Sequence, residues 1–283
     1  MFKRILNPVW AFDMEWAPDP RGGRLLHNLP DSASDEEVMA TMWAKNGATP
    51  ENPEPFLKPA LCRIVSIAAV TRQSRKEGGP PQLHLISLPK DPADPAQNDE
   101  RHVVGHFLKA LGERRPMLVG YNSIAADLRA LVQRGIILGL SAPEFCKRPD
   151  KPWEGADYFA KMSDWNVDLK DAITPGWGGG SPSLNEMATL SGIPGKMEVD
   201  GQQVPRMWLD KRLPEIVAYN EFDAVTTYLL FLRVSYFGGH FTDAQYQAEQ
   251  EEVRRLLERE ADAGRVHLRR YLAEWDRLKA RVA

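Results

Sequence analysis

The chain has 283 residues, of which 43% are hydrophobic and 27% charged, as is usual for a globular protein of one large domain or two smaller ones. Its formal net charge of -3 excludes a strong overall basic field, so a nucleic-acid partner would need a local groove and metal ions. Two cysteines, no apolar signal segment and no run near the roughly 20 apolar residues of a membrane span favour a reduced, cytoplasmic protein without a membrane partner.

The first predicted strand carries two acids on one side. An apolar run near the N-terminus is broken at alternate positions by Asp13 and Glu15. Residues two apart in a strand point to the same side, so these carboxylates stand together while Phe12, Met14 and Trp16 pack on the opposite face. Two close carboxylates repel, and a hard divalent ion such as Mg²⁺, which favours oxygen ligands, would relieve that repulsion. An edge strand with two solvated acids is the alternative.

A segment rich in proline, glycine and polar residues follows, from about residue 18 to residue 60. Within it, Ser34 and Glu37 have the spacing of a capping box, which predicts a short helix through about Lys45. The segment is too long for a tight turn, so we expect a packed excursion or a lid beside the first strand. A surface elaboration without function is the alternative.

Strands and helices then alternate. Nearly continuous apolar, β-branched residues predict a central strand over residues 62–70, and polar-apolar alternation predicts its hairpin partner over 83–88. Helical spacing predicts a helix over 99–112. A short buried strand over 116–121 leads into a helix over about 126–135. This order indicates an α/β protein with its strands first.

The start of the helix after the fourth strand carries a further acid, Asp127, where the helix macrodipole favours negative charge. A carboxylate in the turn after a buried strand lies at the sheet edge where α/β proteins place their sites, so we assign Asp127 to the site. Residues 167–169 predict another short strand or its end. The glycine-rich run 176–180 lacks the ending of a P-loop and is interpreted as a linker. A capping box predicts a short helix over 183–192.

The last strong element is a buried helix over about 214–236. It carries Tyr219 and Asp223, which are four residues apart and therefore side by side on one face. Beyond Gly239 the composition shifts to charged residues with apolar residues at helical intervals, which predicts two helices joined near Gly264.

Together these stretches resemble the three exonuclease motifs of the DEDD superfamily of 3′→5′ exonucleases. Phe12-Asp13-Met14-Glu15 resembles the first motif, Gly120-Tyr121-Asn122 through Asp127 the second, and Tyr219-Asn220-Glu221-Phe222-Asp223 the third. One subgroup has a histidine five positions before the last Asp, where this chain has Ala218. Tyr219 therefore indicates the tyrosine subgroup.

Two further features narrow the resemblance. The step from Asn122 to Asp127 is similar to the proofreading domains of family B DNA polymerases. Ser191-Gly192-Ile193-Pro194-Gly195-Lys196 followed by Asp200-Gly201 resembles stand-alone bacterial proteins predicted to be exonucleases related to that domain. The residue before the second-motif Asp is usually aromatic in the family and here is Ala126, a departure that removes no metal ligand.

The resemblance covers about residues 9–233 and implies a ribonuclease H-like fold, which is a mixed five-stranded sheet flanked by helices. In this chain we expect the exonuclease domain over residues 1–238, interrupted by the insertion at about 18–60. A C-terminal helical extension is expected over residues 239–283.

The resemblance also implies hydrolysis of DNA or RNA from its 3′ end to nucleoside 5′-monophosphates with two divalent ions, Mg²⁺ or Mn²⁺. By that resemblance, Asp13 would bridge both ions, and Glu15 and Asp223 would help hold the ion that activates water. Asp127 would hold the other ion, largely through water. Tyr219 would orient the attacking water, since a phenol with a reference pKa near 10 is a poor base at pH 7.

We assign Asn122, Trp16 and Lys196 to substrate binding, the partner being a nucleic acid with a single-stranded 3′ end. The preference for DNA or RNA and the oligomeric state stay open. An inactive domain of the same fold that binds nucleic acid or a partner is the alternative. A phosphatase with an aspartyl nucleophile is a third reading, but that chemistry expects Asp-x-Asp followed by Thr or Val, and this chain has Glu15 and then Ala17.

Overall fold

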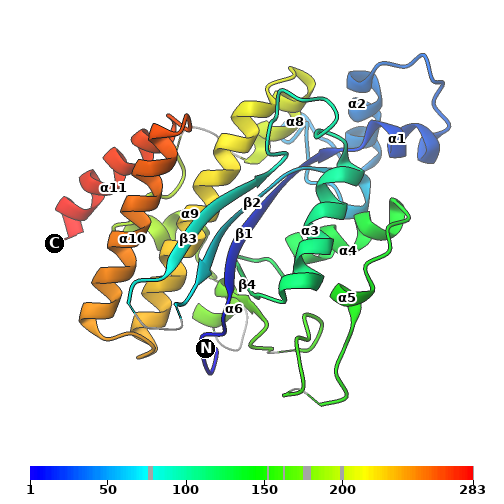
Figure 1. The fold of residues 1–283 in the computed structure, drawn as a ribbon. Coiled ribbons are helices and arrows are strands. Elements are labelled where there is room, and N and C mark those ends of the chain that lie inside the picture. Colours follow the sequence, from blue (N-terminus) through cyan, green and yellow to red (C-terminus); the bar gives the residue numbers. More distant parts are fainter. Residues whose placement is uncertain (76–78, 152, 162, 175–179, 198–200, 283) are drawn as a thin grey trace.

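The computed structural model describes residues 1–75, 79–151, 153–161, 163–174, 180–197 and 201–282. Five strands form one sheet (Figure 1). They are β1 (Val9–Pro18), β2 (Cys62–Gln73), β3 (Gln82–Leu88), β4 (Met117–Gly120) and β5 (Asn166–Asp168). Their order is β3-β2-β1-β4-β5, with β1 in the centre. β1 and β3 are antiparallel to β2, whereas β4 is parallel to both β1 and β5.

Helices cover both faces of this sheet. In Figure 1, α9, α10 and α11 lie on one side of it, and α3, α4 and α5 lie on the other. The helices are α1 (Pro20–His27), α2 (Asp35–Lys45), α3 (Glu100–Arg114), α4 (Asp127–Ile137), α5 (Pro143–Cys146), α6 (Leu169–Ile173), α7 (Leu184–Leu190), α8 (Val204–Leu209), α9 (Leu213–Phe237), α10 (Asp243–Asp262) and α11 (Leu268–Val282). The predicted fold class, a mixed five-stranded sheet with helices on both sides, is confirmed.

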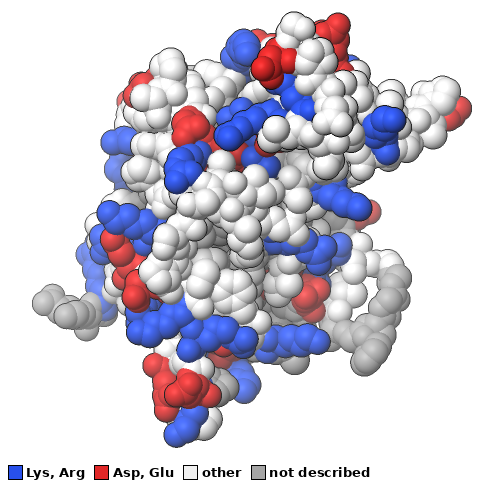
Figure 2. Space-filling view, turned by 90° about the vertical axis from the view of Figure 1, so that its right-hand side faces the viewer, with Lys and Arg blue, Asp and Glu red and all other residues white. Residues whose placement is uncertain are grey.

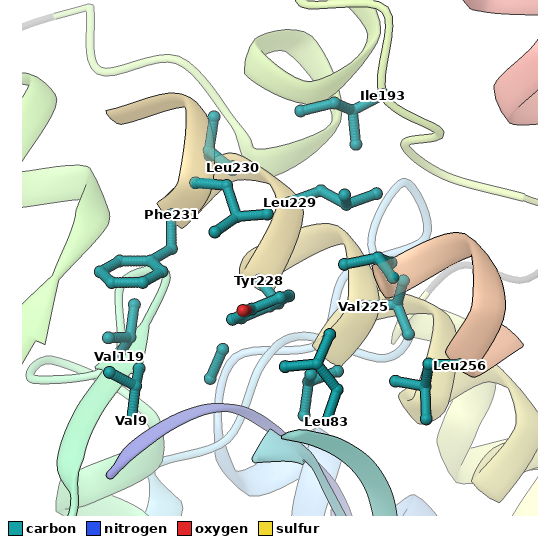
Figure 3. Packing of buried hydrophobic residues seen from close by; sticks show 14 of the residues in the cluster. Val9, Leu83, Val119, Ile193, Val225, Tyr228, Leu229, Leu230, Phe231 and Leu256 are labelled. Carbon is teal, nitrogen blue, oxygen red and sulfur yellow. The ribbon is translucent and has the colours of Figure 1, made fainter. Parts of the chain in front are cut away.

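The alternation of side chains along β1 divides the core into two layers. Val9 and Ala11 belong to the layer under α9, α10 and α11, whereas Phe12 and Met14 belong to the layer under α3 and α4. Figure 3 shows the first layer, in which buried side chains of α9 pack above the strands. Trp16 packs against the second layer. The predicted placement of the apolar β1 side chains opposite Asp13 and Glu15 is therefore confirmed.

Most predicted elements are present within one to three residues of their expected ends, including the two C-terminal helices. The capping box at Ser34 begins α2, and another at Ser183 begins α7. The sequence did not predict the short helices α1, α5, α6 and α8. α1 contains two adjacent glycines, which are poor helix formers, but Gly23 lies so close to α2 that a Cβ would come 2.6 Å from Val38 and Met42. Tertiary contact, rather than propensity, explains this helix.

Residues 176–179 of the glycine-rich run, as well as Asp200 of the loop after Lys196, lie outside the described residues. Among the helices that are described, none has the length and apolar character needed to cross a membrane. The assignment of residues 1–238 to a catalytic domain and 239–283 to an extension stays a prediction, as does the cytoplasmic location.

A buried ion cluster anchors the start of the insertion. Arg134 of α4 donates to Glu100 of α3 at 2.6 Å and to Asp19 at 2.8 Å, and all three side chains are buried. Asp19 is also the N-cap of α1. Breaking one partner of such a buried cluster leaves an uncompensated charge, so the root of the insertion is held firmly against the body of the protein.

Candidate active site

The two acids of β1 meet a third acid from α9. Single carboxylate oxygens of Asp13, Glu15 and Asp223 all lie within 4.8 Å of one another. On β2, the residues directly opposite Asp13 and Glu15 are Ala68 and Ser66. These side chains are small, so α9 can approach the strand at this point. The predicted convergence of the first and third motifs is thus observed.

A register shift between β1 and β2 occurs at Glu15 and Trp16. Bulges of this kind bend a strand and re-aim its side chains, and they are frequent beside active sites. Trp16 both packs on the apolar layer and lines the cavity that contains the acids. The position assigned to substrate binding is therefore available to a ligand in that cavity.

Asp13 is held by an amide from α9. The Asn220 Nδ2 atom donates to Asp13 Oδ2 at 2.7 Å, and Ser66 Oγ donates to Asn220 Oδ1 at 2.9 Å. The hydroxyl thus orients the amide so that its N–H group faces the carboxylate. Burial raises the pKa of Asp13 well above its ordinary value, and the charges of Asp127, Glu15 and Asp223 raise it further. The amide opposes this shift by favouring the ionised form.

Tyr219 lies one helical turn before Asp223, and its hydroxyl hydrogen-bonds to that carboxylate. The ring is buried. Burial, followed by the charges of Asp223, Glu15 and Asp13, raises the pKa of Tyr219 far above its ordinary value. The phenol therefore keeps its proton at neutral pH and can orient a ligand by hydrogen bonding.

Asp127 begins α4 and is buried next to the three acids. Its carboxylate accepts hydrogen bonds from its own backbone N–H and from that of Met14. Burial, together with the charges of Asp168 and Asp223, raises the pKa of Asp127 to about 7. Asp127 shares the cavity with the other acids but is outside the group whose oxygens lie within 4.8 Å.

The turn before Asp127 is held by Asp168 at the end of β5. This carboxylate accepts from the backbone N–H groups of Asn122 at 2.8 Å and Ile124 at 3.0 Å. Asn122 has a φ of 61°, in the left-handed region that asparagine tolerates. At Gly120 a Cβ would come 2.4 Å from that of Ser123, so only glycine fits this close approach. The second motif is therefore a rigid corner.

One cavity of about 290 Å³ contains the acids and two of the residues assigned to substrate binding, Trp16 and Asn122. Ala126, where the family usually has an aromatic residue, also lines it. The opposite wall comes from the insertion, with Trp43 of α2 and residues 54–57. Phe56 in that wall is 79% exposed although it is a large apolar side chain.

Lys196, the third residue assigned to substrate binding, lies elsewhere. It lines an adjoining cavity of about 260 Å³ that shares Tyr219 and Asp223 with the first. Its backbone N–H donates to Asn185 Oδ1 at 2.6 Å. Lys196 is thus placed beside the third motif rather than beside Asp13 and Glu15.

A protein-family profile described as "Predicted 3'-5' exonuclease related to the exonuclease domain of PolB" matches residues 54–275. The chain belongs to this family. The match includes Asp127, Tyr219 and Asp223, whereas Asp13 and Glu15 precede it, so their membership in the site comes from the structure. The search of curated proteins found no match.

Among solved structures, this chain is similar to the family B DNA polymerase from the hyperthermophilic archaeon Pyrobaculum calidifontis. The two share 19% sequence identity with a TM-score of 0.47. The similarity covers 91% of this chain and 29% of the polymerase chain.

The three clustered carboxylates of this protein fit a hard divalent cation. Asp13, Glu15 and Asp223 offer only oxygen ligands, which Mg²⁺ and Mn²⁺ prefer. Burial of Asp13 and the charges of its neighbours raise its pKa, and a cation among the carboxylates would offset that rise. The three carboxylates are therefore suited to hold such an ion.

Sequence reasoning missed two residues that position the site. Asn220 belongs to the third motif but received no predicted role, although its position next to Tyr219 indicates that it lies near the acids. Asp168 was recognised only as the end of a strand. Its position at the carboxyl end of β5 could have marked it, since that edge of the sheet carries the site.

Proposed function

We propose that the protein is a metal-dependent 3′→5′ exonuclease that releases nucleoside 5′-monophosphates from the 3′ end of a nucleic-acid strand. The observation that carries this proposal is the meeting of Asp13, Glu15 and Asp223 within 4.8 Å, in one cavity with Asp127 and Tyr219. Membership of a family of predicted 3′→5′ exonucleases supports the same reaction.

Two divalent ions, Mg²⁺ or Mn²⁺, are the proposed cofactors. Asp13 would contact both, Glu15 and Asp223 would hold the first, and Asp127 would hold the second, largely through water. When bound, such ions lower the pKa of water and neutralise charge on the attacked phosphate and the departing 3′ oxygen. The closeness of Asp127 to the trio, evident from its effect on the pKa of Asp13, supports a second position beside the first.

The protein's own groups orient the reactants. Tyr219, which keeps its proton and contacts Asp223, would hold the attacking water by its hydroxyl. Asn220 keeps Asp13 in one orientation through a hydrogen bond of 2.7 Å. Positioning of this kind lowers the barrier because the reacting groups no longer have to be ordered during the reaction.

A single-stranded 3′ end is the proposed substrate. The acids form one wall of the cavity, and Trp16, Trp43 and Phe56 contribute aromatic surface around it. Aromatic side chains stack on unpaired bases without regard to sequence. A terminal base against this surface would place its phosphodiester beside the carboxylates. Such a base is available only when the strand end is unpaired.

The test is a gel time course with 5′-labelled single-stranded DNA and RNA of matched sequence, in Mg²⁺ or Mn²⁺. We expect a ladder that shortens from the 3′ end, and its rate on each strand will give the sugar preference. The ladder should be absent in chelator and in the Asp223→Asn variant. Chromatography of the products should show nucleoside 5′-monophosphates.

Two results would contradict the proposal. Release of inorganic phosphate from a phosphorylated end, without shortening, would indicate a phosphatase instead. Binding of the strand by folded, metal-loaded protein without any hydrolysis would indicate an inactive nucleic-acid-binding module of the same fold.

A further inference from the structure

A smaller cavity with two basic side chains adjoins the active site. Its volume is about 180 Å³. The residues that line it are Arg63, Val65, Pro92, Asn98, Trp208, Lys211 and Leu213. Arg63 belongs to β2, Trp208 to α8, and Lys211 to the turn between α8 and α9. This lining contains two cations and no carboxylate.

Arg63 and Lys211 differ from two neighbouring arginines. Nearby Arg206 and Arg212 pair with Glu54 and Glu215 at 2.5 Å. Within the described part of the chain, neither Arg63 nor Lys211 forms an ion pair, and the buried Nε of Arg63 has no hydrogen-bond partner. Both charges are therefore available to an anion that enters the cavity.

Trp208 positions the two cations. The Cζ atom of Arg63 lies 5.2 Å from the centroid of the Trp208 ring, and the Nζ atom of Lys211 lies 5.7 Å from it. Cation–π attraction at these distances restrains both side chains. Since the ring is already in contact with two cations, the cavity offers positive charge and N–H donors more than an open aromatic face. This chemistry favours a phosphate over a base.

The cavity lies next to the proposed reaction centre. Cys62 lines the active-site cavity and Arg63, the next residue of β2, lines this one. On α8, Pro205 lines the first cavity and Trp208, three residues later, lines the second. Trp208 also packs on the cluster that contains Tyr219. The two cavities thus adjoin across α8 and the start of β2.

We propose that Arg63, Lys211 and Trp208 form a binding site for a backbone phosphate of the strand whose 3′ end occupies the active-site cavity. The inference rests on the proposed function and names a contact that the reaction itself does not need. A chain with a net charge of -3 has to hold a polyanion by local groups. Figure 2 shows one face of the protein, on which basic and acidic side chains surround a broad central area that has neither. That face therefore has no uniformly basic surface.

The experiment measures binding by fluorescence anisotropy, with 5′-labelled single strands whose 3′-terminal linkages are phosphorothioates to slow hydrolysis. Wild type is compared with an Arg63→Met/Lys211→Met double variant in Mg²⁺ across a salt series. For a long strand we expect the double variant to bind about tenfold more weakly at low salt. The salt slope of the logarithm of affinity should fall by roughly 0.7 for each lost phosphate contact. A dinucleotide, whose single internal phosphate would lie at the reaction centre, should bind equally to both proteins.

Matched variants separate this effect from misfolding. Lys211→Met alone changes an exposed turn residue and should give about half of the change in slope, and Arg63→Lys should keep most of the wild-type slope. Lys109→Met on α3, where the lysine is 73% exposed and pairs with Glu113 at 3.8 Å, should behave as wild type. Turnover of the double variant should show a raised KM with an unchanged kcat.

The failures are distinguishable. If wild type degrades strands but the double variant binds long strands with wild-type affinity and slope, the phosphate site is wrong and the proposed function stands. A calorimetric titration with inorganic phosphate then identifies the source of the anion: binding to wild type and not to the double variant, with strand affinity unchanged, would assign the cavity to free phosphate and overturn the strand contact. If wild type neither binds nor degrades any strand, the proposed function itself fails.

Discussion

The active-site cavity has two walls of different construction. The acidic wall is made by β1, α4 and α9, with Glu15 and Asp127 buried. The opposite wall is made by the insertion, where Phe56 is 79% exposed. The groups proposed to perform the chemistry therefore come from core elements, and the groups proposed to contact the substrate come from a surface excursion.

The acidic wall is held at several points. Asp13 is oriented by Asn220, which is itself oriented by Ser66, and Asp127 accepts from the Met14 backbone. These contacts join β1, β2, α4 and α9. They hold repelling carboxylates in place at some expense to the stability of the metal-free protein, because burial of an uncompensated charge is unfavourable.

One arginine of α8 contacts the insertion wall at three points. Arg206 donates from Nε to Glu54 at 2.6 Å and from Nη1 to Glu36 at 3.1 Å, and its Cζ lies 5.6 Å from the ring centroid of Trp43. Its side chain is 50% exposed, and exposed ion pairs stabilise proteins weakly. Changes in this wall should therefore affect substrate binding without unfolding the protein.

The largest expected effect is loss of activity when the acidic wall loses a charge. Asp13→Asn keeps the shape of the side chain and an acceptor for Asn220, but removes the charge that would hold the ions. We expect hydrolysis to fall by more than about 10³-fold. Initial rates at saturating Mg²⁺ will measure this. Wild-type turnover in a folded Asp13→Asn protein would overturn the assignment of the site.

The next effect concerns Tyr219. Tyr219→Phe removes the hydroxyl and leaves the acids in place, so kcat should fall by about 10²-fold, the size of effect expected when a reacting group is misplaced. Stabilisation of the protein by added Mg²⁺ should persist, which thermal unfolding will show. A kcat equal to that of wild type would mean that the tyrosine only packs.

A smaller effect is expected in the insertion wall. Phe56→Ala should raise KM about tenfold and change kcat little, since stacking on an unpaired base contributes about 1–3 kcal/mol. Steady-state kinetics on a single strand will separate the two constants, and Phe56→Trp should restore KM. Phe237→Ala, which removes an aromatic group that is 81% exposed at the end of α9, is the control. A raised KM in the control as well would remove the special role of Phe56.

The smallest effect concerns stability and follows from the pKa of Asp127, which is raised from 3.8 to about 7 in the folded protein. The folded state binds this proton more tightly than the unfolded state, so its stabilising effect is complete below about pH 4 and is lost as pH rises through 7. In chelator, we expect Asp127→Asn to flatten the fall in Tm between about pH 4 and pH 7, where each kcal/mol of pH-dependent stability corresponds to about 2–4 °C in Tm. Scanning calorimetry of both proteins will test this. A steeper fall in the variant would contradict the sign.

Much of the fold was predictable because capping boxes and the spacing of apolar residues are local patterns within single helices and strands. The capping boxes at Ser34 and Ser183 begin real helices, and the apolar spacing of α9 and of the two C-terminal helices is borne out. α1, in the insertion, and α8, shortly before α9, were harder to predict because both helices are short and are stabilised by packing. Lys196 was grouped with the other substrate residues, whereas the structure places it in an adjoining cavity.

By itself, the sequence determined what depends on spacing along one element. Asp13 and Glu15 share a side of β1, and Tyr219 and Asp223 share a side of α9, because the repeats of a strand and a helix are local geometry. Only the tertiary structure decided which elements meet. The amide of Asn220 reaches Asp13 across 207 positions of the sequence, and Arg63 of β2 meets Trp208 and Lys211 at the end of α8. Such contacts depend on how helices pack on the sheet, and a pattern within a single element does not contain that information.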